Sequence, residues 1–127
     1  MPPEPTIFVV DDDEAVRNSL EALLQSAGLR VVLYGSGLEF LEGYETCGQG
    51  CVLLDLEMPA LSGLAVLEVL AAERRAIPAI VMTGHACAAT QRRAMEAGAL
   101  TVLKKPLHAQ SLLDTIRTAL RRRQCEP

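Results

Sequence analysis

Residues 51–55 read Cys-Val-Leu-Leu-Asp, four apolar residues that end on a carboxylate. A short continuous apolar run is typical of a central parallel strand, because such a strand is buried on both faces of its sheet. The following segment 57–63, Glu-Met-Pro-Ala-Leu-Ser-Gly, has the composition of a loop and leads into a helical pattern. The expected core stripe of that helix is Leu64, Leu67, Leu70 and Ala71. This stretch therefore predicts one strand followed by one helix.

The same alternation of strand and helix continues on both sides of this unit, five times in all. The expected strands are 6–10, 30–34, 51–54, 78–82 and 101–104, and the expected helices are 14–27, one starting after Ser36, one through 64–71, 88–97 and one through 112–120. Ser36 and Glu39 have the spacing of a capping box, and Gly28 and Gly98 each follow a helical pattern as expected for C-terminal glycines. Such alternation predicts an α/β fold with a five-stranded parallel sheet and helices on both faces.

Length and composition favour one domain with one ordinary core. A chain of 127 residues buries roughly two-thirds of the surface that its unfolded form exposes. We expect a single domain over residues 1–127, with its core at about 6–120 and residues 121–127 as a free tail or the start of a linker. Half of the residues are hydrophobic, which excludes a disordered chain, and the apolar runs are too short to cross a bilayer. Because the first five residues lack a signal-peptide pattern, we expect a cytoplasmic protein with no membrane association.

The cysteines and the charge balance exclude some other classes of site. The spacings of Cys47, Cys51, Cys87 and Cys125 match no zinc pattern, so free thiols are expected. The formal net charge of −4 argues against nucleic acid as a direct ligand of this domain. The basic run 121–123 is interpreted as a solvated helix terminus rather than a binding patch.

Polar residues follow four of the five expected strands. Asp11, Asp12 and Asp13 follow the first strand, Asp55 ends the third, Thr83 follows the fourth, and Lys104, Lys105 and Pro106 come at the end of the fifth. In a doubly wound sheet, ligands bind outside the carboxyl ends of the strands, near the point where the strand order reverses. We therefore expect acids, a hydroxyl and an amine to meet at one edge.

Two interpretations of the acidic run remain open at this point. Carboxylates at 11–13 could simply cap the helix that follows and favour its dipole. Asp55 favours a metal site, because two charges ~4 Å apart repel by ~4 kcal/mol at an effective dielectric of ~20. Oxygen ligands suit a hard ion, and Mg²⁺ fits better than a fully caged Ca²⁺. A carboxylate beside a metal and Lys105 can act as a nucleophile toward a phosphoryl group.

Four motifs, in this order and at these spacings, resemble the receiver domain of bacterial two-component response regulators. They are Val9–Glu14, Leu53–Pro59 with Ser62-Gly63, Val81–His85, and Lys104–Pro106. The resemblance covers Thr6 to about Leu120. It implies a flavodoxin-like fold with strand order 2-1-3-4-5, and a phosphorylation-controlled signalling domain rather than an enzyme in the ordinary sense.

The resemblance also implies a role for each matching residue. Asp55 is then the phosphoacceptor and a Mg²⁺ ligand, Asp12 a direct ligand, and Asp11 a ligand that acts largely through water. The backbone carbonyl of Glu57 is the remaining protein ligand. The amine that pairs with the phosphate is that of Lys105, whose bond to the following proline is commonly cis in this family, while Lys104 is left as a surface residue. The Thr83 hydroxyl closes onto the phosphate.

The implied partners follow from the same resemblance. The donor is the phosphohistidine of a sensor histidine kinase, for which small acyl phosphates can substitute. Phosphorylation shifts a two-state equilibrium and alters the surface of the fourth helix, fifth strand and last helix, which commonly mediates dimerisation. The segments Thr83–His85 and Met95–Ala99 look most like the FixJ-type branch. Such a protein contacts DNA only through an output domain, so this chain is either cut after its last helix, the favoured alternative, or a free-standing receiver.

Val102, Glu57 and His85 carry further expectations, and two alternative functions remain open. Val102 replaces the aromatic switch residue of many receivers, so the transmission of the signal is expected to differ. Glu57 and His85 are expected to tune the lifetime of the acyl phosphate, although His85 could equally be a solvent-facing loop residue. The first rival is a haloacid dehalogenase-like phosphatase, which would use the spacing of Asp11 and Asp13. The second rival is a receiver-like interaction module that no longer accepts phosphate, and the presence of all the acids, the threonine and the lysine argues against it.

Overall fold

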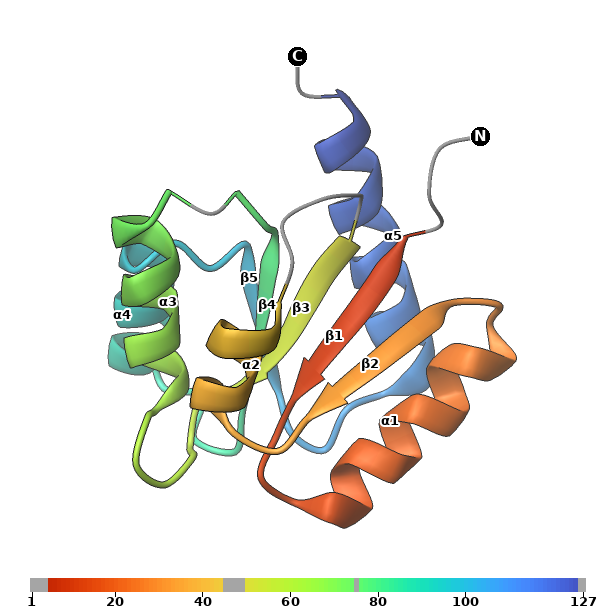
Figure 1. Cartoon of the computed structure of the whole chain (residues 1–127), viewed down its shortest axis with the longest axis horizontal. Helices are drawn as coiled ribbons and strands as arrows, with labels where there is room; N and C mark the ends of the chain where they lie inside the picture. Colours follow the sequence, from red (N-terminus) through yellow and green to blue (C-terminus); the bar gives the residue numbers. More distant parts are fainter. Residues whose placement is uncertain (1–4, 45–49, 75, 126–127) are drawn as a thin grey trace.

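The computed structural model describes residues 5–44, 50–74 and 76–125, with side chains up to Arg121. The strands are β1 (Thr6–Val10), β2 (Arg30–Tyr34), β3 (Gly50–Asp55), β4 (Ala79–Thr83) and β5 (Thr101–Lys104). The helices are α1 (Glu14–Ser26), α2 (Gly37–Gly43), α3 (Gly63–Ala72), α4 (Ala88–Glu96) and α5 (Ala109–Cys125), as Figure 1 shows. Every strand lies within one residue of its expected bounds, whereas α5 continues past the expected end of the core at residue 120.

The strands form one parallel sheet in the order β2-β1-β3-β4-β5, as the resemblance implied. β2 lies on one side of β1, whereas β3, β4 and β5 follow on its other side. The strand order therefore reverses between β1 and β3, which are neighbours in the sheet. Val10 of β1 pairs with Leu54 of β3, so the residues that follow them, Asp11 and Asp55, are adjacent at the carboxyl edge. The register thus brings together two acids that are far apart in the sequence.

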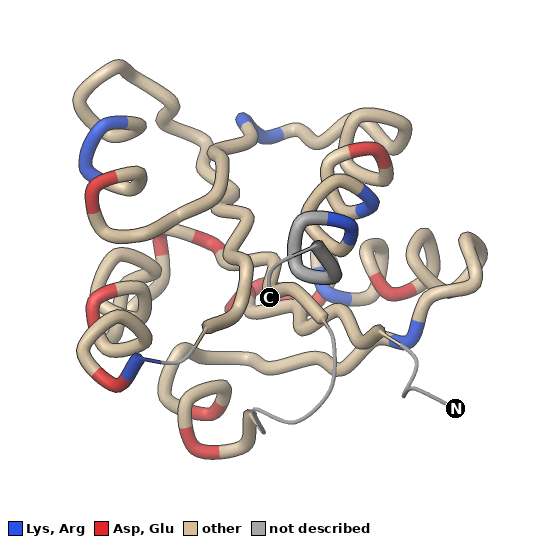
Figure 2. The backbone as a smooth tube through the Cα atoms, turned by 90° about the horizontal axis from the view of Figure 1, so that it is seen from above, with Lys and Arg blue, Asp and Glu red and all other residues tan. Residues whose placement is uncertain are grey.

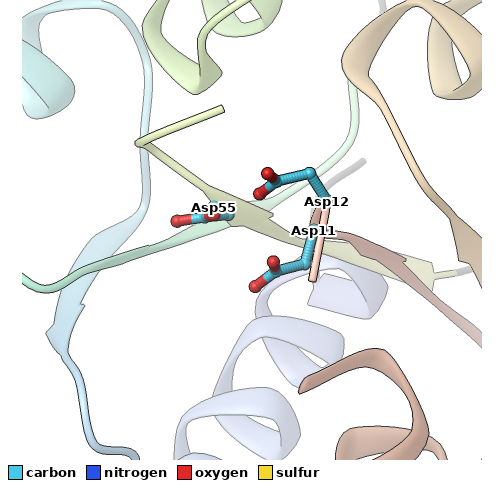
Figure 3. Close-up of side chains that lie close together, drawn as sticks. All are labelled: Asp11, Asp12 and Asp55. Carbon is cyan, nitrogen blue, oxygen red and sulfur yellow. The ribbon is translucent and has the colours of Figure 1, made fainter. Parts of the chain in front are cut away.

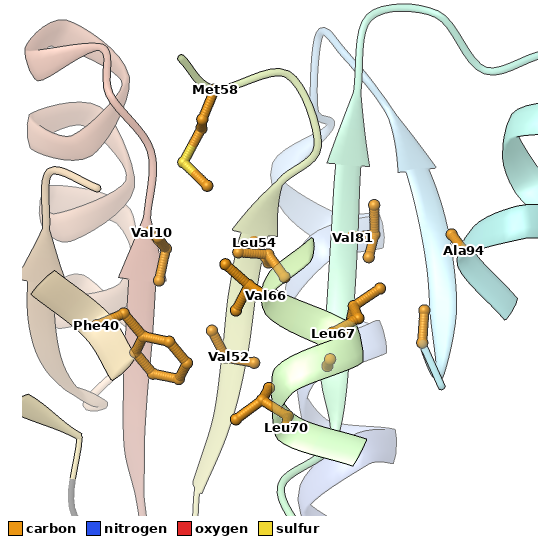
Figure 4. Close-up of a cluster of buried hydrophobic side chains, with 12 residues drawn as sticks. Val10, Phe40, Val52, Leu54, Met58, Val66, Leu67, Leu70, Val81 and Ala94 are labelled. Atoms are coloured by element: carbon orange, nitrogen blue, oxygen red, sulfur yellow. The ribbon is translucent and has the colours of Figure 1, made fainter. Parts of the chain in front are cut away.

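The core consists of two clusters, one on each face of the sheet. Successive side chains of a strand point to opposite faces, and in β3 Val52 and Leu54 join one cluster while Cys51 and Leu53 join the other. The first cluster, drawn in Figure 4, also contains Phe40 of α2, Val66, Leu67 and Leu70 of α3, and Ala94 of α4. The second contains residues of α1 and α5, among them Leu24 and Ile116. Because β3 is fully buried on both faces, its position is fixed tightly.

The local signals at the helix ends are largely confirmed. Gly28 and Gly98 have φ values of +83° and +113°, and each donates its N–H to the last turn of the helix before it. The Ser36 hydroxyl accepts from the Glu39 N–H, as a capping box requires, but the Glu39 carboxylate accepts from Gly35 instead of Ser36. The capping-box expectation is therefore correct for one of its two bonds.

The expected core stripe of α3 was partly wrong. Val66, Leu67 and Leu70 are buried, whereas Ala71 is exposed and Leu64 only half-buried. The helix reads Gly-Leu-Ala-Val-Leu-Glu-Val-Leu-Ala-Ala, apolar on nearly every side, so its periodicity could not single out the buried face. Within the described residues, no helix is long and apolar enough to span a membrane.

Candidate functional site

Three carboxylates meet at the carboxyl edge of the sheet, as the sequence predicted. Asp11 and Asp12 directly follow β1, and Asp55 is the last residue of β3. One oxygen from each of the three lies within 4.8 Å of the others, and Figure 3 shows the side chains turned toward a common point. Asp11 and Asp55 are buried, with 0% and 3% of their surface exposed, whereas Asp12 is open to solvent. Two of the three carboxylates are thus buried, and the cluster is open to solvent on the side of Asp12.

A single amine faces this cluster from the end of β5. The Nζ atom of Lys105 lies 3.2 Å from an oxygen of Asp11 and 3.2 Å from an oxygen of Asp55. Its backbone N–H donates to the carbonyl of Thr83, and its bond to Pro106 is cis, as the resemblance implied. Lys104 is exposed at the end of its strand. Of the two lysines, the one expected from the sequence is the one that reaches the acids.

The balance of charge at this edge remains negative. Burial, together with the negative charge of Asp11, raises the pKa of Asp55 from 3.8 to about 6, although Lys105 acts in the opposite direction. Burial lowers the pKa of the Lys105 amine, but the facing carboxylates of Asp55 and Asp11 outweigh it, so that pKa is raised. One ammonium group therefore compensates the cluster only in part. An all-oxygen donor set with excess negative charge fits a hard divalent cation such as Mg²⁺.

The third acid of the run, Asp13, serves the helix instead of the cluster. Its carboxylate accepts from the N–H groups of Ala15 and Val16 at 2.8 and 3.2 Å, which makes it the N-cap of α1. Its own N–H donates to a carboxylate oxygen of Asp11 at 2.9 Å and so helps to hold that side chain. The capping interpretation is thus confirmed for Asp13, whereas the metal-site interpretation of Asp11 and Asp12 stays a prediction.

Sequence reasoning missed a bond that supports this turn from α1. The guanidinium of Arg17 donates to the backbone carbonyl of Asp11 at 2.7 Å. The bond fixes the backbone of the first acid from the side of the helix. Arg17 stands one turn after Asp13, but nothing in that spacing distinguishes a residue that bonds to the strand end from an ordinary surface arginine.

The Thr83 hydroxyl lies at the same edge, but the sequence did not predict its hydrogen-bond partner. It is buried and donates to Oε2 of Glu57 at 2.7 Å, while the N–H of Gly84 donates to Oε1 of the same carboxylate at 2.9 Å. The His85 N–H donates to the Thr83 oxygen at 3.0 Å, and the residue itself is exposed. The sequence predicted a metal-ligand role for the Glu57 carbonyl and an effect of Glu57 on the lifetime of the acyl phosphate, but not this bridge, because no local pattern links residue 57 to residue 83.

The backbone around Asp55 is held by the start of α3. A Cβ atom built on Gly63 would lie 2.4 Å from the carbonyl oxygen of Asp55 and 2.8 Å from the Cα of Leu56. The Gly63 N–H donates to the carbonyl of Leu56 at 3.1 Å. Only glycine allows the helix to begin this close to the end of β3. The Ser-Gly pair of the sequence motif therefore has a steric reason.

With this geometry established, comparison with known proteins identifies the family. The family model of the response regulator receiver domain matches residues 7–117. This chain belongs to that family. A phosphoacceptor role is general to its members, and they act in signalling, so the receiver fold and the two-component assignment are confirmed.

The receiver is similar to part of the length of several regulators. It is 41% identical over 118 residues to the response regulator protein TmoT of Ectopseudomonas mendocina, which covers 93% of this chain and 54% of that protein. It is 39% identical over 121 residues to the transcriptional regulatory protein FixJ of Bradyrhizobium diazoefficiens, covering 95% of this chain and 58% of that protein. The chain thus spans little more than half the length of these relatives, and the FixJ-type resemblance is confirmed.

Solved structures agree with this assignment. The response regulator StyR superposes with a TM-score of 0.88 at 42% identity, covering 96% of this chain and 64% of that chain. FixJ-N superposes with a TM-score of 0.86 at 34% identity, covering 94% of this chain and 95% of that one. Family membership goes against the haloacid dehalogenase-like alternative, and so does the use of Asp13 as a helix cap.

The cysteines agree with the expectation of free thiols where they can be assessed. Cys51 is a buried free thiol in β3, where burial raises its pKa to about 12, and Cys87 is an exposed free thiol before α4. Cys47 and the side chain of Cys125 lie outside the described residues. The same holds for the side chains of Arg122 and Arg123.

Proposed function

We propose that this receiver accepts a phosphoryl group on the carboxylate of Asp55 from the phosphohistidine of a sensor histidine kinase. The observation that carries the proposal is the convergence of three strand ends: Asp11, Asp12 and Lys105 all gather around Asp55. Asp11, Asp12, Asp55 and the backbone carbonyl of Glu57 would hold Mg²⁺. The ion would neutralise charge on the oxygens of the phosphoryl group during transfer.

The chain's own residues account for the remaining chemistry. An oxygen of Asp55 attacks phosphorus, the P–N bond to the donor histidine breaks, and the histidine nitrogen leaves with the bonding electrons. Lys105, already within 3.2 Å of Asp55, stays to pair with a phosphoryl oxygen. The Thr83 hydroxyl follows by donating to another of these oxygens. The acyl phosphate then persists until water removes it, so the domain is a switch and not a turnover enzyme.

The output is proposed to be a change in the surface formed by α4, β5 and α5, through which two phosphorylated copies would form a homodimer. Val102, the residue in the place of the usual aromatic switch, is half-buried in β5, pairs with Val81 and packs against the core. A valine has no ring to rotate between an outer and an inner position. Signal transmission is therefore proposed to use movement of the backbone around Thr83.

DNA is proposed to be contacted only through a further domain, as the names of the transcriptional relatives suggest. The chain has a formal net charge of −4, and Figure 2 shows its basic residues spread over several elements. Such a distribution offers little of the concentrated positive field that phosphate backbones require. We place the receiver in the cytoplasm, where the kinase domain of a sensor would meet it.

The decisive experiment uses acetyl phosphate and Mg²⁺ as a substitute donor. Intact-mass measurement should show one phosphoryl group on the wild type and none on Asp55→Asn. Asp13→Asn serves as the matched control, because it removes the same charge two residues from Asp11 while asparagine keeps the N-cap. It should still be phosphorylated. A phosphoryl group on Asp11, or undiminished incorporation into Asp55→Asn, would refute the proposal. A wild type inert to both a kinase and acyl phosphates would favour the receiver-like module that no longer accepts phosphate.

A further inference from the structure

The Glu57 carboxylate accepts hydrogen bonds from two donors at the end of β4. Its two oxygens accept from the Thr83 hydroxyl at 2.7 Å and from the Gly84 N–H at 2.9 Å. These short bonds to an ionised acceptor are of the charge-assisted kind, which is stronger than a neutral hydrogen bond. They join the loop after β3 to the loop after β4 across 26 residues of sequence. The bridge is thus a specific feature of the tertiary structure.

The hydroxyl of Thr83 has no second proton to offer. A threonine hydroxyl has a single donor and two acceptor positions. Its proton is directed to Glu57, and one of its lone pairs accepts from the His85 N–H at 3.0 Å. The hydroxyl therefore cannot donate to a phosphoryl oxygen on Asp55 while it donates to Glu57.

Glu57 is also attached to the acceptor itself. Its backbone N–H donates to a carboxylate oxygen of Asp55 at 3.3 Å, so its side chain starts two residues from the site of charge. A phosphoryl group on Asp55 would add negative charge two residues from Glu57, and like charges repel. Phosphorylation of Asp55 requires the Thr83 hydroxyl, and it would also repel the Glu57 carboxylate that holds this hydroxyl.

We propose that the Glu57 carboxylate is a built-in competitor of the phosphoryl group for the Thr83 hydroxyl and the Gly84 amide, and must release both before the switch can close. The inference rests on the proposed phosphorylation of Asp55. It makes Glu57 a positioning residue that acts through Thr83. It also assigns a direction to the effect of Glu57, because removing its charge favours the closed, phosphoryl-bound arrangement.

The structure provides a place for the released side chain. An open pocket of about 310 Å³ lies beside Glu57, with His85 and Arg93 among the residues that line it. Leu56 and Leu64 form apolar parts of the same wall. A carboxylate that turns into this pocket leaves Thr83 and approaches the side of α4 that carries a guanidinium. Loss of the hydrogen bonds from Thr83 and Gly84 to Glu57 would therefore couple phosphorylation of Asp55 to α4.

The test compares the binding of beryllofluoride, a phosphoryl mimic, with Mg²⁺ present. Glu57→Gln keeps the shape of the side chain and loses its charge, and Glu57→Ala removes both acceptor oxygens. We expect beryllofluoride to bind each variant about fivefold more tightly than wild type, which corresponds to ~1 kcal/mol. Calorimetry and the amide resonance of Gly84 both report this binding. Before ligand is added, the Gly84 amide proton should move upfield in both variants, because a charge-assisted bond has been lost.

Two controls separate competition through Thr83 from a general field effect. Glu14→Gln removes the same unit charge from the first turn of α1, next to the acid run. A general effect would tighten binding in Glu14→Gln as in Glu57→Gln, whereas competition predicts little change in the former. In a Thr83→Val background, the gain from Glu57→Gln should shrink, because the hydroxyl being competed for is absent. An undiminished gain there would overturn the inference.

The outcomes also distinguish this inference from the proposed function. Wild-type binding of beryllofluoride with equal or weaker binding in both Glu57 variants would overturn the competitor and leave the phosphoacceptor intact. Binding by the variants alone would support a competitor strong enough to block the wild type. If neither the wild type nor the variants bind the mimic, both ideas fail together. Because Glu57 is exposed, its replacement should not prevent folding, and the amide spectrum verifies this.

Discussion

At the scale of single residues, the site is a case of charge placed where it is poorly solvated. Asp55 is almost fully buried and lies beside a second buried acid, while one lysine is shared between the two. Burial of an ionised carboxylate is unfavourable unless partners compensate for it. The protein's own groups therefore compensate the charge of Asp55 only in part. This partial compensation makes the carboxylate receptive to a cation.

This leads to a prediction about pH in the presence of a chelator. The pKa of Asp55 is about 6 in the folded protein and ~3.9 in an unfolded chain, so the folded state binds the proton more tightly. The stability that this group contributes is fully present below the unfolded value and is lost as pH rises through about 6. Between pH 4 and 7, wild type should lose roughly 2–3 kcal/mol relative to Asp55→Asn. Urea unfolding across this pH range measures the difference, and parallel curves for the two proteins would contradict the prediction.

At the scale of elements, the junction between β3 and α3 fixes the acceptor. The strand is buried on both faces and ends at Asp55, and the helix begins at Gly63 in direct contact with that backbone. The sequence pattern located both elements but predicted the buried face of α3 only in part, because the helix is apolar on nearly every side. The glycine at its first position was part of a motif, but the reason for it became visible only when the two backbones were seen together.

Gly63→Ala should therefore damage fold and site at once. The added methyl group would meet the Asp55 carbonyl at 2.4 Å, and such backbone clashes cannot be relieved by a side-chain rotation. We expect a loss of about 1–3 kcal/mol in the free energy of unfolding, with weaker Mg²⁺ binding. Denaturant titration and metal titration measure the two effects.

Gly35→Ala is the matched control for that substitution. There the nearest atom to an added Cβ is the carboxylate end of Glu39 at 3.2 Å, a flexible group that can move. Its effect on stability should be clearly smaller and its metal affinity near that of wild type. Equal losses in the two alanine variants would show that the contact at Gly63 is not the cause.

At the scale of the whole molecule, the parallel sheet brings charged residues from distant parts of the sequence to one edge. Strand ends that are distant in sequence meet because the order is β2-β1-β3-β4-β5 and every strand runs the same way. The acids come from two neighbouring strands and the amine from the edge strand β5. A cation bound there would tie these elements together in the folded state only.

Mg²⁺ should consequently stabilise the entire domain. A ligand that binds only the folded state at a hundred times its dissociation constant adds ~2.7 kcal/mol. For a chain of this size we expect the melting temperature to rise by roughly 10 °C. Thermal melts at increasing Mg²⁺ measure the rise, which should be largely absent in Asp12→Asn because a direct ligand is weakened. A melting temperature independent of Mg²⁺ in the wild type would rule out the proposed ion.

Local features of the sequence were enough to predict the kinds and order of the elements and the residues at the strand ends. Periodicity and turn residues are local signals, and parallel strands bring their carboxyl ends to one edge whatever the loops do. Three features became known only from the folded chain: Glu57 holds Thr83, Arg17 supports Asp11, and burial raises the pKa of Asp55 to about 6. These depend on the exact path of irregular loops and on burial among residues distant in the chain, for which no local pattern exists.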